Sequence, residues 1–292
     1  MDAGMSQRQD GIDARAFYDG LGVDYDLMVS WEGRLEREKA FLGRICSDVG
    51  ARSVLDAACG TGMHAAWFAH QGLRAAGADV SPVMIERARE NARAAQVDVD
   101  FRVAGFGELA RAFPSRFDVT TCLGNSLPHL LDDASLSAAL RDFAAVTEPG
   151  GALVIQTRNY DGLLKKRTRF MPVSSRVNGQ EETLFLRITD YRDQGELIDF
   201  TVVTLKKRSG AWSQSARTTP LRALRRQTME SALQAAGFTQ VRVFGGYDSS
   251  PLDETASADL IITARRNEYS RTSPSMATPN LPPASPRSRF PR

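Results

Sequence analysis

Segments with strand-like and helix-like patterns alternate along much of this chain, and this alternation limits the fold more than any other feature. Short, largely apolar segments of strand length occur at residues 52–57, 73–79, 99–103, 117–123 and 151–158. Helical patterns lie before and between them, including those at residues 34–49, 82–95 and 135–146. Parallel strands need crossover helices of this kind. The sequence therefore predicts an α/β fold with a Rossmann-like, doubly wound sheet.

The alternation breaks after the fifth strand segment. Strand-like segments at 183–191, 196–207 and 212–221 follow one another with turn residues and no helical pattern between them. We expect them to form a small antiparallel insertion, about residues 180–222, appended to the main sheet. A helix at 228–236 and two further strands then complete a seven-stranded sheet, and the predicted domain covers residues 15–266.

The two ends of the chain differ in composition from this domain. Residues 1–14 are polar and without a periodic pattern, and residues 267–292 are rich in Ser, Pro and Arg. Such segments bury too little apolar surface to offset the entropy that is lost on ordering. We expect both ends to be disordered.

Composition and charge argue against several classes of function. The 37 Lys and Arg residues nearly balance the 35 Asp and Glu residues, which gives no electrostatic reason to expect a nucleic-acid or membrane partner. The three cysteines and three histidines show neither disulfide nor metal-ligand spacing. No segment has the roughly 18 apolar residues of a membrane helix, and the first residues lack the apolar part of a signal peptide. We expect a cytoplasmic enzyme that uses no metal and acts on a small molecule, as a monomer or a homo-oligomer.

The most informative stretch is the turn after the first strand, Val54-Leu55-Asp56-Ala57-Ala58-Cys59-Gly60-Thr61-Gly62. A strand that leads through a glycine-rich turn into a helix is typical of nucleotide sites, because glycines let the backbone approach the ligand closely. The spacing alone also fits the loose dinucleotide pattern of a nicotinamide-dependent oxidoreductase. Asp56 disfavours that alternative, since a carboxylate there opposes a pyrophosphate and favours a ligand with cationic groups.

A second acidic residue, Asp79, ends the second predicted strand. Its carboxylate can accept hydrogen bonds from both hydroxyls of a ribose. The alternative is that it only adds negative charge at the start of the helix that Ser81 and Pro82 open. Because Asp79 occurs together with Asp56 and the glycine turn, the ribose interpretation is favoured. S-adenosylmethionine, which is cationic and contains a ribose, fits these residues.

These residues carry a resemblance to a known family. VLDAACGTG (54–62) and ADVSPVMIERAREN (78–91) resemble the class I S-adenosylmethionine-dependent methyltransferases, over roughly residues 15–266. Three further segments are similar to glycine N-methyltransferases and related small-amine methyltransferases: WEGRLEREKAFL (31–42), CLGNSLPHL (122–130) and GGALVIQTRNYD (150–161). That family also has an antiparallel insertion after the fifth strand.

The resemblance implies a site for S-adenosylmethionine. Arg34 would pair with the methionyl carboxylate, Tyr25 would close over the cofactor, and Asp79 would hold the ribose. Gly105 replaces the acid or amide that contacts the adenine amino group in relatives. The other implied cofactor residues present backbone atoms or apolar surface, with a plain core role as the alternative for the methionine and the phenylalanine: Ala58, Cys59, Gly60, Gly62, Met84, Phe106 and Leu123.

The resemblance also implies an acceptor site at the carboxyl ends of the central strands. Arg158 would clamp a substrate carboxylate, with an internal salt bridge to Asp161 as the alternative. Asn125 would align the acceptor or cap the turn after the fourth strand. His129 is the candidate general base, with a hydrogen-bonded structural role as the alternative. Two tyrosines complete the implied substrate contacts, the first as a lid: Tyr18 and Tyr160.

The predicted function is methyl transfer from S-adenosylmethionine to a small molecule, most directly to the amine of glycine, another amino acid or a small amine. Phe200 and Thr218 stand where the family offers tyrosines to the substrate, so glycine itself is a hypothesis. A natural-product O- or N-methyltransferase and a non-catalytic S-adenosylmethionine-binding regulator are the alternatives.

Overall fold

Seven strands form the main sheet of the protein, whose computed structural model describes residues 13–22, 24–179, 181–192 and 195–268. The strand order is β10-β11-β5-β4-β1-β2-β3. β11 runs antiparallel to both its neighbours, and the other pairs are parallel. The strands are β1 (Ser53–Asp56), β2 (Arg74–Asp79), β3 (Asp100–Val103), β4 (Phe117–Cys122), β5 (Thr147–Arg158), β10 (Phe238–Phe244) and β11 (Asp259–Arg266). The predicted doubly wound sheet is confirmed.

Alternate residues of the central strands supply two apolar layers. Leu55 and Leu153 belong to one cluster of buried side chains, whereas Val54 and Val154 belong to another. Because successive side chains of a strand point to opposite faces, helices can cover both. The helices α6 (Leu109–Ala112), α7 (Asp133–Val146) and α9 (Arg226–Ala235) cover the first face, and α3 (Trp31–Asp48) and α4 (Met63–His70) the second.

Helix α5 (Pro82–Ala94) begins as the sequence predicts. The Ser81 side chain accepts a hydrogen bond from the backbone N–H of Met84, and Pro82 occupies the first turn. This cap fixes the path of the chain immediately after Asp79, at the carboxyl end of β2. Among the described residues, no helix is long and apolar enough to cross a membrane.

The insertion after β5 is larger than predicted and forms a sheet of its own. Its four antiparallel strands lie in the order β6-β7-β8-β9, so the predicted antiparallel insertion is present and is separate from the seven-stranded sheet. They are β6 (Ser174–Asn178), β7 (Glu181–Arg192), β8 (Leu197–Arg208) and β9 (Ala211–Arg222). The sequence pattern indicates antiparallel pairing but does not say which sheet the strands join. β6 was missed because it is a short, polar edge strand.

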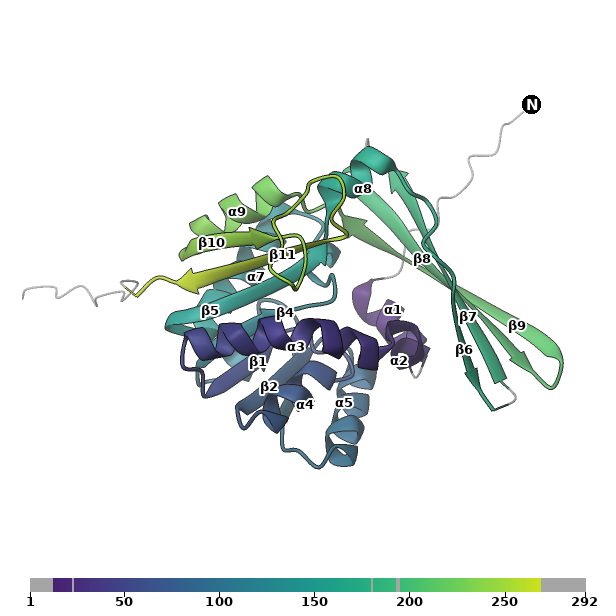
Figure 1. Cartoon of the computed structure of the whole chain (residues 1–292), viewed down its shortest axis with the longest axis horizontal. Helices are drawn as coiled ribbons and strands as arrows, with labels where there is room; N and C mark the ends of the chain where they lie inside the picture. Colours follow the sequence, from purple (N-terminus) through teal and green to yellow (C-terminus); the bar gives the residue numbers. More distant parts are fainter. Residues whose placement is uncertain (1–12, 23, 180, 193–194, 269–292) are drawn as a thin grey trace, which may run out of the picture.

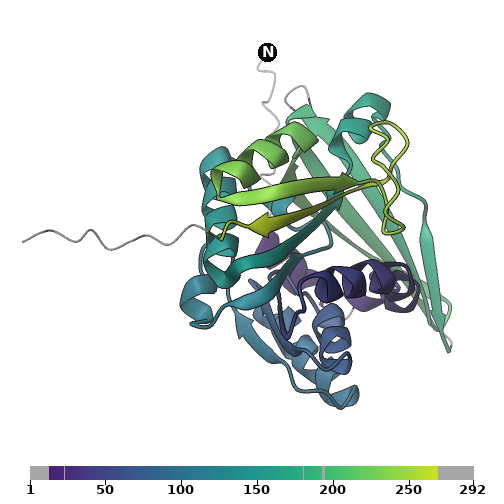
Figure 2. The same cartoon turned by 60° about the vertical axis from the view of Figure 1, so that its left-hand side comes forward.

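Two short helices lie between the two sheets (Figures 1 and 2). They are α1 (Ala14–Leu21), whose first turn Asp13 caps, and α2 (Asp24–Val29). Phe17 and Leu21 of α1 pack against Phe185 and Val202 of the insertion. The helix α8 (Tyr160–Lys166) follows β5, and the short 3₁₀ helix η1 (Leu127–His129) follows β4.

The predicted disorder of the two ends concerns residues that lie largely outside the described ones. This holds for residues 1–12 and 269–292. Asp13 and Ala14 belong to the start of α1, and the backbone N–H of Asn267 donates to the carbonyl of Gly237. The domain therefore extends at least from Asp13 to Asn267.

Candidate active site

Three neighbouring cavities lie where the carboxyl ends of the central strands face α1 and the insertion. The first has a volume of about 360 Å³, and the acidic side chain of Asp79 lines it together with the apolar residues Val80, Ala104, Phe106 and Leu130. A carboxylate beside apolar walls suits a ligand with hydroxyls and a flat apolar ring. The predicted cofactor residues Ala58 and Gly105 also lie on its surface, as do Tyr18 and His129.

The Asp79 carboxylate is held by the backbone. Its Oδ2 accepts from the N–H of Gly60 at 2.9 Å, and its Oδ1 accepts from the N–H of Ser81 at 2.9 Å. Burial raises the pKa of Asp79 to about 6, although both hydrogen bonds oppose the rise. Because a carboxylate offers about four lone-pair sites, each oxygen can still accept a hydrogen bond from a ligand.

The two glycines of the turn serve different purposes. Gly62 has a φ of 76°, and a Cβ there would lie 2.6 Å from the Phe101 ring and 2.7 Å from the Ala88 Cβ, so it allows α4 to pack closely. Gly60 has a φ of 52°, and a Cβ there would face the Tyr25 ring at 3.5–3.7 Å. The space between Gly60 and Tyr25 is therefore narrow, and Tyr25 closes over the turn.

The second cavity, about 250 Å³, is rich in arginine. Arg34, Arg37, Arg158 and Arg187 line it, against the acids Glu38 and Asp259. Arg34 pairs with Glu38, with 2.9 Å between Nε and Oε1, and its guanidinium also faces Gly124, where a Cβ would lie 3.5 Å from Nη2. An arginine beside a bare backbone is suited to hold a carboxylate.

A buried charge chain stands behind Arg34. Glu38 Oε2 lies 2.5 Å from His64 Nε2, and His64 Nδ1 lies 3.9 Å from Asp56 Oδ2. Burial opposes the ionisation of Glu38, but the hydrogen bond from His64 and the charge of Arg34 outweigh it and lower the pKa. Asp56 Oδ2 has no hydrogen-bond partner among the described residues, and burial raises the pKa of Asp56. Sequence reasoning missed Glu38 and His64; the i, i+4 spacing of Arg34 and Glu38 was the available signal.

Tyr18 and His129 separate the first cavity from the second. The Tyr18 hydroxyl lies 3.2 Å from His129 Nε2, and Thr219 Oγ1 lies 3.5 Å from His129 Nδ1. Both aromatic residues line both cavities. Burial lowers the pKa of His129 to about 4, so the imidazole is neutral at physiological pH. A neutral imidazole with this pKa holds an additional proton only weakly.

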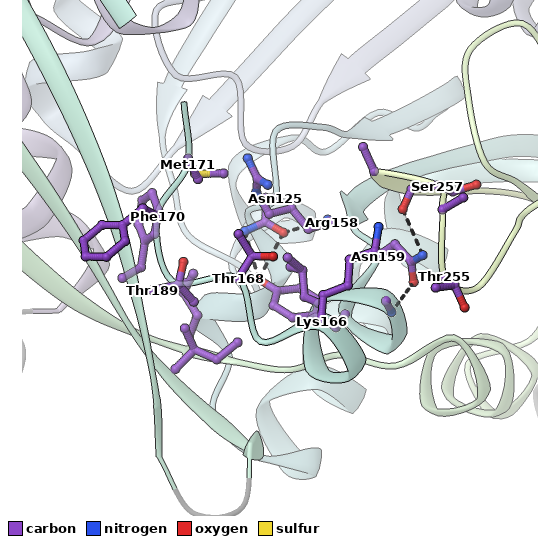
Figure 3. Close-up of a pocket in the computed structure, with 18 of the residues that line it drawn as sticks. Asn125, Arg158, Asn159, Lys166, Thr168, Phe170, Met171, Thr189, Thr255 and Ser257 are labelled. Carbon is purple, nitrogen blue, oxygen red and sulfur yellow. Dashed lines mark hydrogen bonds between the residues drawn. The ribbon is translucent and has the colours of Figure 1, made fainter. Parts of the chain in front are cut away.

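The predicted acceptor residues come together at the ends of β4 and β5 (Figure 3). Asn125, at a φ of 66°, donates from Nδ2 to the Tyr160 hydroxyl at 3.0 Å, and its Oδ1 accepts from the N–H of Arg158 at 2.9 Å. The alternative salt bridge does not form between Arg158 and Asp161, whose carboxylate accepts instead from the backbone N–H of Arg226. Within the described part of the chain, no carboxylate lies within ion-pair distance of the Arg158 guanidinium.

Several predicted residues lie outside these cavities. Met84 is 1% exposed and Leu123 is 3% exposed, and both belong to the apolar core. Cys59 is buried in a cluster with Phe101 behind the turn. Of the two residues that stand where the family has tyrosines, Phe200 lines two of the cavities, whereas the Thr218 hydroxyl lies 2.8 Å from that of Thr201.

Comparison with known proteins bears on the fold and on the kind of domain. Residues 54–151 match the sequence family described as a methyltransferase domain. The structure superposes on an S-adenosylmethionine-dependent methyltransferase from Clostridium acetobutylicum with a TM-score of 0.72 at 14% identity, over 86% of this chain and 99% of that one. Residues 54–151 therefore have the sequence of a methyltransferase domain.

Curated relatives of this methyltransferase domain have names that specify a substrate. The chain is 38% identical over 141 residues to the glycine/sarcosine N-methyltransferase of Parasynechococcus marenigrum, which is 48% of this chain and 50% of the relative. It is 34% identical over 153 residues to the glycine/sarcosine N-methyltransferase of Halorhodospira halochloris, which is 51% of this chain and 55% of the relative. The chain thus matches about half the length of these relatives.

Proposed function

We propose that this chain transfers the methyl group of S-adenosylmethionine to the amine of a small acceptor that bears a carboxylate, such as glycine or another amino acid. One observation carries the acceptor class: Arg158, whose backbone N–H donates to Asn125, lines the second cavity, and its guanidinium has no carboxylate at ion-pair distance in the described residues. A planar guanidinium in that position can bind a carboxylate through two parallel hydrogen bonds. The names of the glycine/sarcosine N-methyltransferases that match half of the chain support the same class.

The residues present fit the cofactor. Asp79 would accept hydrogen bonds from the ribose hydroxyls in the first cavity, where Phe106 and Val80 offer apolar surface for the adenine. Arg34 would pair with the methionyl carboxylate, and Ala58 and Gly60 would present backbone atoms to the same part of the molecule. When bound, S-adenosylmethionine supplies an electrophilic methyl group.

The chain itself would orient the acceptor and exclude water. An amine must be unprotonated to act as a nucleophile, and the positive charge of the four arginines of the second cavity exceeds the negative charge of Glu38 and Asp259, which disfavours an ammonium ion there. The neutral His129 would hold Tyr18 in place rather than take up the amine proton, which would leave to solvent. Catalysis would then depend on proximity and desolvation.

Turnover with a small panel of acceptors tests this proposal. The purified full-length chain is incubated with S-adenosylmethionine and either glycine, sarcosine or a catechol, and S-adenosylhomocysteine is quantified. Formation that depends on an amine supports the proposal. Turnover of the hydroxyl acceptor alone contradicts it, and so does cofactor binding in calorimetry without turnover of any acceptor, which is the behaviour of a non-catalytic binder.

A further inference from the structure

A third cavity, about 420 Å³, continues from the acceptor residues away from the cofactor turn. It lies between α8, the start of the insertion and the loop before β11 (Figure 3). Phe170 and Met171 lie on one side and Thr255 and Ser257 on the other, with Arg158 between them. Cavities of about 300–1,000 Å³ accommodate ligands of drug size. Glycine, which has no side chain, would leave this space unused.

The three cavities follow one another in a fixed order. Tyr18 and His129 line the first and the second, whereas Asn125, Arg158, Phe200 and Leu221 line the second and the third. An acceptor amine must lie on the side of Arg158 that faces the cofactor residues. A carboxylate held by Arg158 therefore places any side chain of the same molecule at the entrance of the third cavity.

The walls of the third cavity are chiefly apolar. Leu163, Ile198 and Leu221 form part of a cluster around Tyr160. Phe170, at 59% exposure, stands at the edge of the cavity as a large apolar side chain. The polar side chains of the lining include Asn125, Arg158, Asn159, Lys166, Thr168, Thr189, Thr255 and Ser257. Apolar walls hold water poorly, so an apolar group gains free energy by entering.

We infer that the acceptor is an amino acid with a large apolar side chain, whose carboxylate binds Arg158 and whose side chain occupies the third cavity. This inference rests on the proposed function and specifies its substrate. It also assigns the insertion a role, because Phe200 and Leu221 come from β8 and β9. The insertion thereby selects the size of the acceptor.

The test compares acceptors that differ in one part at a time. Full-length protein is assayed with glycine, L-leucine, L-phenylalanine and phenethylamine, which lacks the carboxylate. We expect kcat/KM for phenylalanine to exceed that for glycine by at least about tenfold, since even one methylene in an apolar pocket gives a factor of this order. Phenethylamine should be much poorer than phenylalanine.

A pair of variants tests whether the side chain of the acceptor occupies the third cavity. Ala256 lines the third cavity and is exposed, so Ala256→Trp can narrow the cavity without disturbing the core. We expect it to lower the ratio of kcat/KM for phenylalanine to that for glycine by at least about tenfold. Ala94, exposed at the end of α5 and outside the three cavities, gives the matched control Ala94→Trp, which should leave the ratio unchanged.

The outcomes separate the two proposals. Methylation of glycine or sarcosine with no preference for larger amino acids, or an equal effect of Ala256→Trp on both acceptors, would overturn the inference and leave the proposed function standing. Turnover of none of these amines by a chain that binds S-adenosylhomocysteine would overturn the proposed function, and the inference with it.

Discussion

The hydroxyl of Tyr18 lies 3.2 Å from Nε2 of His129 and connects α1 to the segment that follows β4. The two residues are far apart in the sequence, and their contact forms the boundary between the first and the second cavity. Burial raises the pKa of Tyr18 well above its usual value, so the hydroxyl keeps its proton and can donate a hydrogen bond to the neutral imidazole. The bond therefore needs no change of charge at physiological pH.

Removal of the Tyr18 hydroxyl should weaken the attachment of α1 to the segment that follows β4. Tyr18→Phe keeps the ring but loses the bond, and a typical hydrogen bond contributes about 0.5–1.5 kcal/mol. We expect calorimetry to show S-adenosylhomocysteine binding that is about two- to tenfold weaker. Tyr247→Phe is the matched control, because the buried hydroxyl of Tyr247 has no hydrogen-bond partner in the described residues. Equal effects of the two substitutions would contradict a specific role for Tyr18.

Cofactor affinity should depend on pH through Asp79. The pKa of this carboxyl is raised to about 6, so below pH 6 it is largely protonated and loses part of its capacity to accept hydrogen bonds. We expect calorimetric affinity for S-adenosylhomocysteine to rise about tenfold from pH 5 to pH 7 and then level off.

Two variants check the assignment to Asp79. Asp79→Asn should abolish the pH dependence of binding, and Asp79→Ala should weaken binding by about 1–3 kcal/mol. In the unliganded protein, the quantity that depends on pH is the folding stability, and it falls rather than rises as the pH increases. Because the folded pKa lies above the ordinary 3.8, the stability of the unsubstituted chain relative to the Asp79→Asn variant should fall between about pH 4 and pH 6. An unchanged pH profile in Asp79→Asn would exclude this carboxyl as the ribose ligand.

Arg158 should act on the acceptor and not on the cofactor. Hydrogen bonds to charged groups contribute about 1.5–3 kcal/mol, so Arg158→Ala should lower kcat/KM for the acceptor by about ten- to hundredfold, chiefly through KM. The control is Arg208→Ala, which removes an exposed arginine of the insertion paired with Glu181. If Arg158→Ala weakens cofactor binding as much as it affects the acceptor, or strongly lowers the melting temperature, the role of Arg158 is structural.

The buried pair of Arg34 and Glu38 should contribute far more to stability than an exposed pair on the same helix. Glu38→Gln leaves a buried arginine without its carboxylate, and we expect a loss of about 3–5 kcal/mol in urea unfolding. Glu36, which pairs with Lys39 at 2.6 Å and is 65% exposed, gives the control Glu36→Gln, with a loss of about 1 kcal/mol or less. Similar losses for both would show that the buried charge chain is not a stabilising unit.

The turn glycines give a prediction about packing. Gly62→Ala places a Cβ against Phe101 and Ala88 at a positive φ, and should cost about 2–5 kcal/mol in urea unfolding. Gly72 has a φ of 82° but nothing within 4 Å of an added Cβ, so Gly72→Ala should cost only about 1–2 kcal/mol. Comparable costs at the two positions would mean that conformation, and not the contact with β3 and α5, makes glycine necessary.

Local patterns account for what the sequence could predict. The strands β1 to β5 and the helix α5 follow from apolar segments and a Ser-Pro cap. The carboxyl ends of these strands bring Asn125 and Arg158 into contact and place Asp79 at the same edge of the sheet. These signals lie within a few residues of each element. The amino-terminal helices were missed although Phe17 and Leu21 have helical spacing, because such short amphipathic helices depend on packing against the insertion.

The rest of the site depends on contacts between distant segments. Glu38, His64 and Asp56 form one chain only because α3, α4 and β1 pack together, and Thr219 reaches His129 only because the insertion folds back over η1. Met84 lies on a helix that the sequence predicted, but its own surroundings were not predictable in the same way. Its position on α5 suggested an adenine contact, whereas its side chain is buried in the core and Val80 lines the first cavity.

The independence of the second sheet has an evolutionary consequence. Among the described residues, its strands share no backbone hydrogen bonds with the seven strands that hold the glycine turn, and yet they supply Phe200 and Leu221 to the second and third cavities. Substitutions of Phe200 and Leu221 can therefore reshape the second and third cavities and leave the backbone pairing of the seven strands intact. A lineage of such proteins could diversify its acceptors while its donor stays the same.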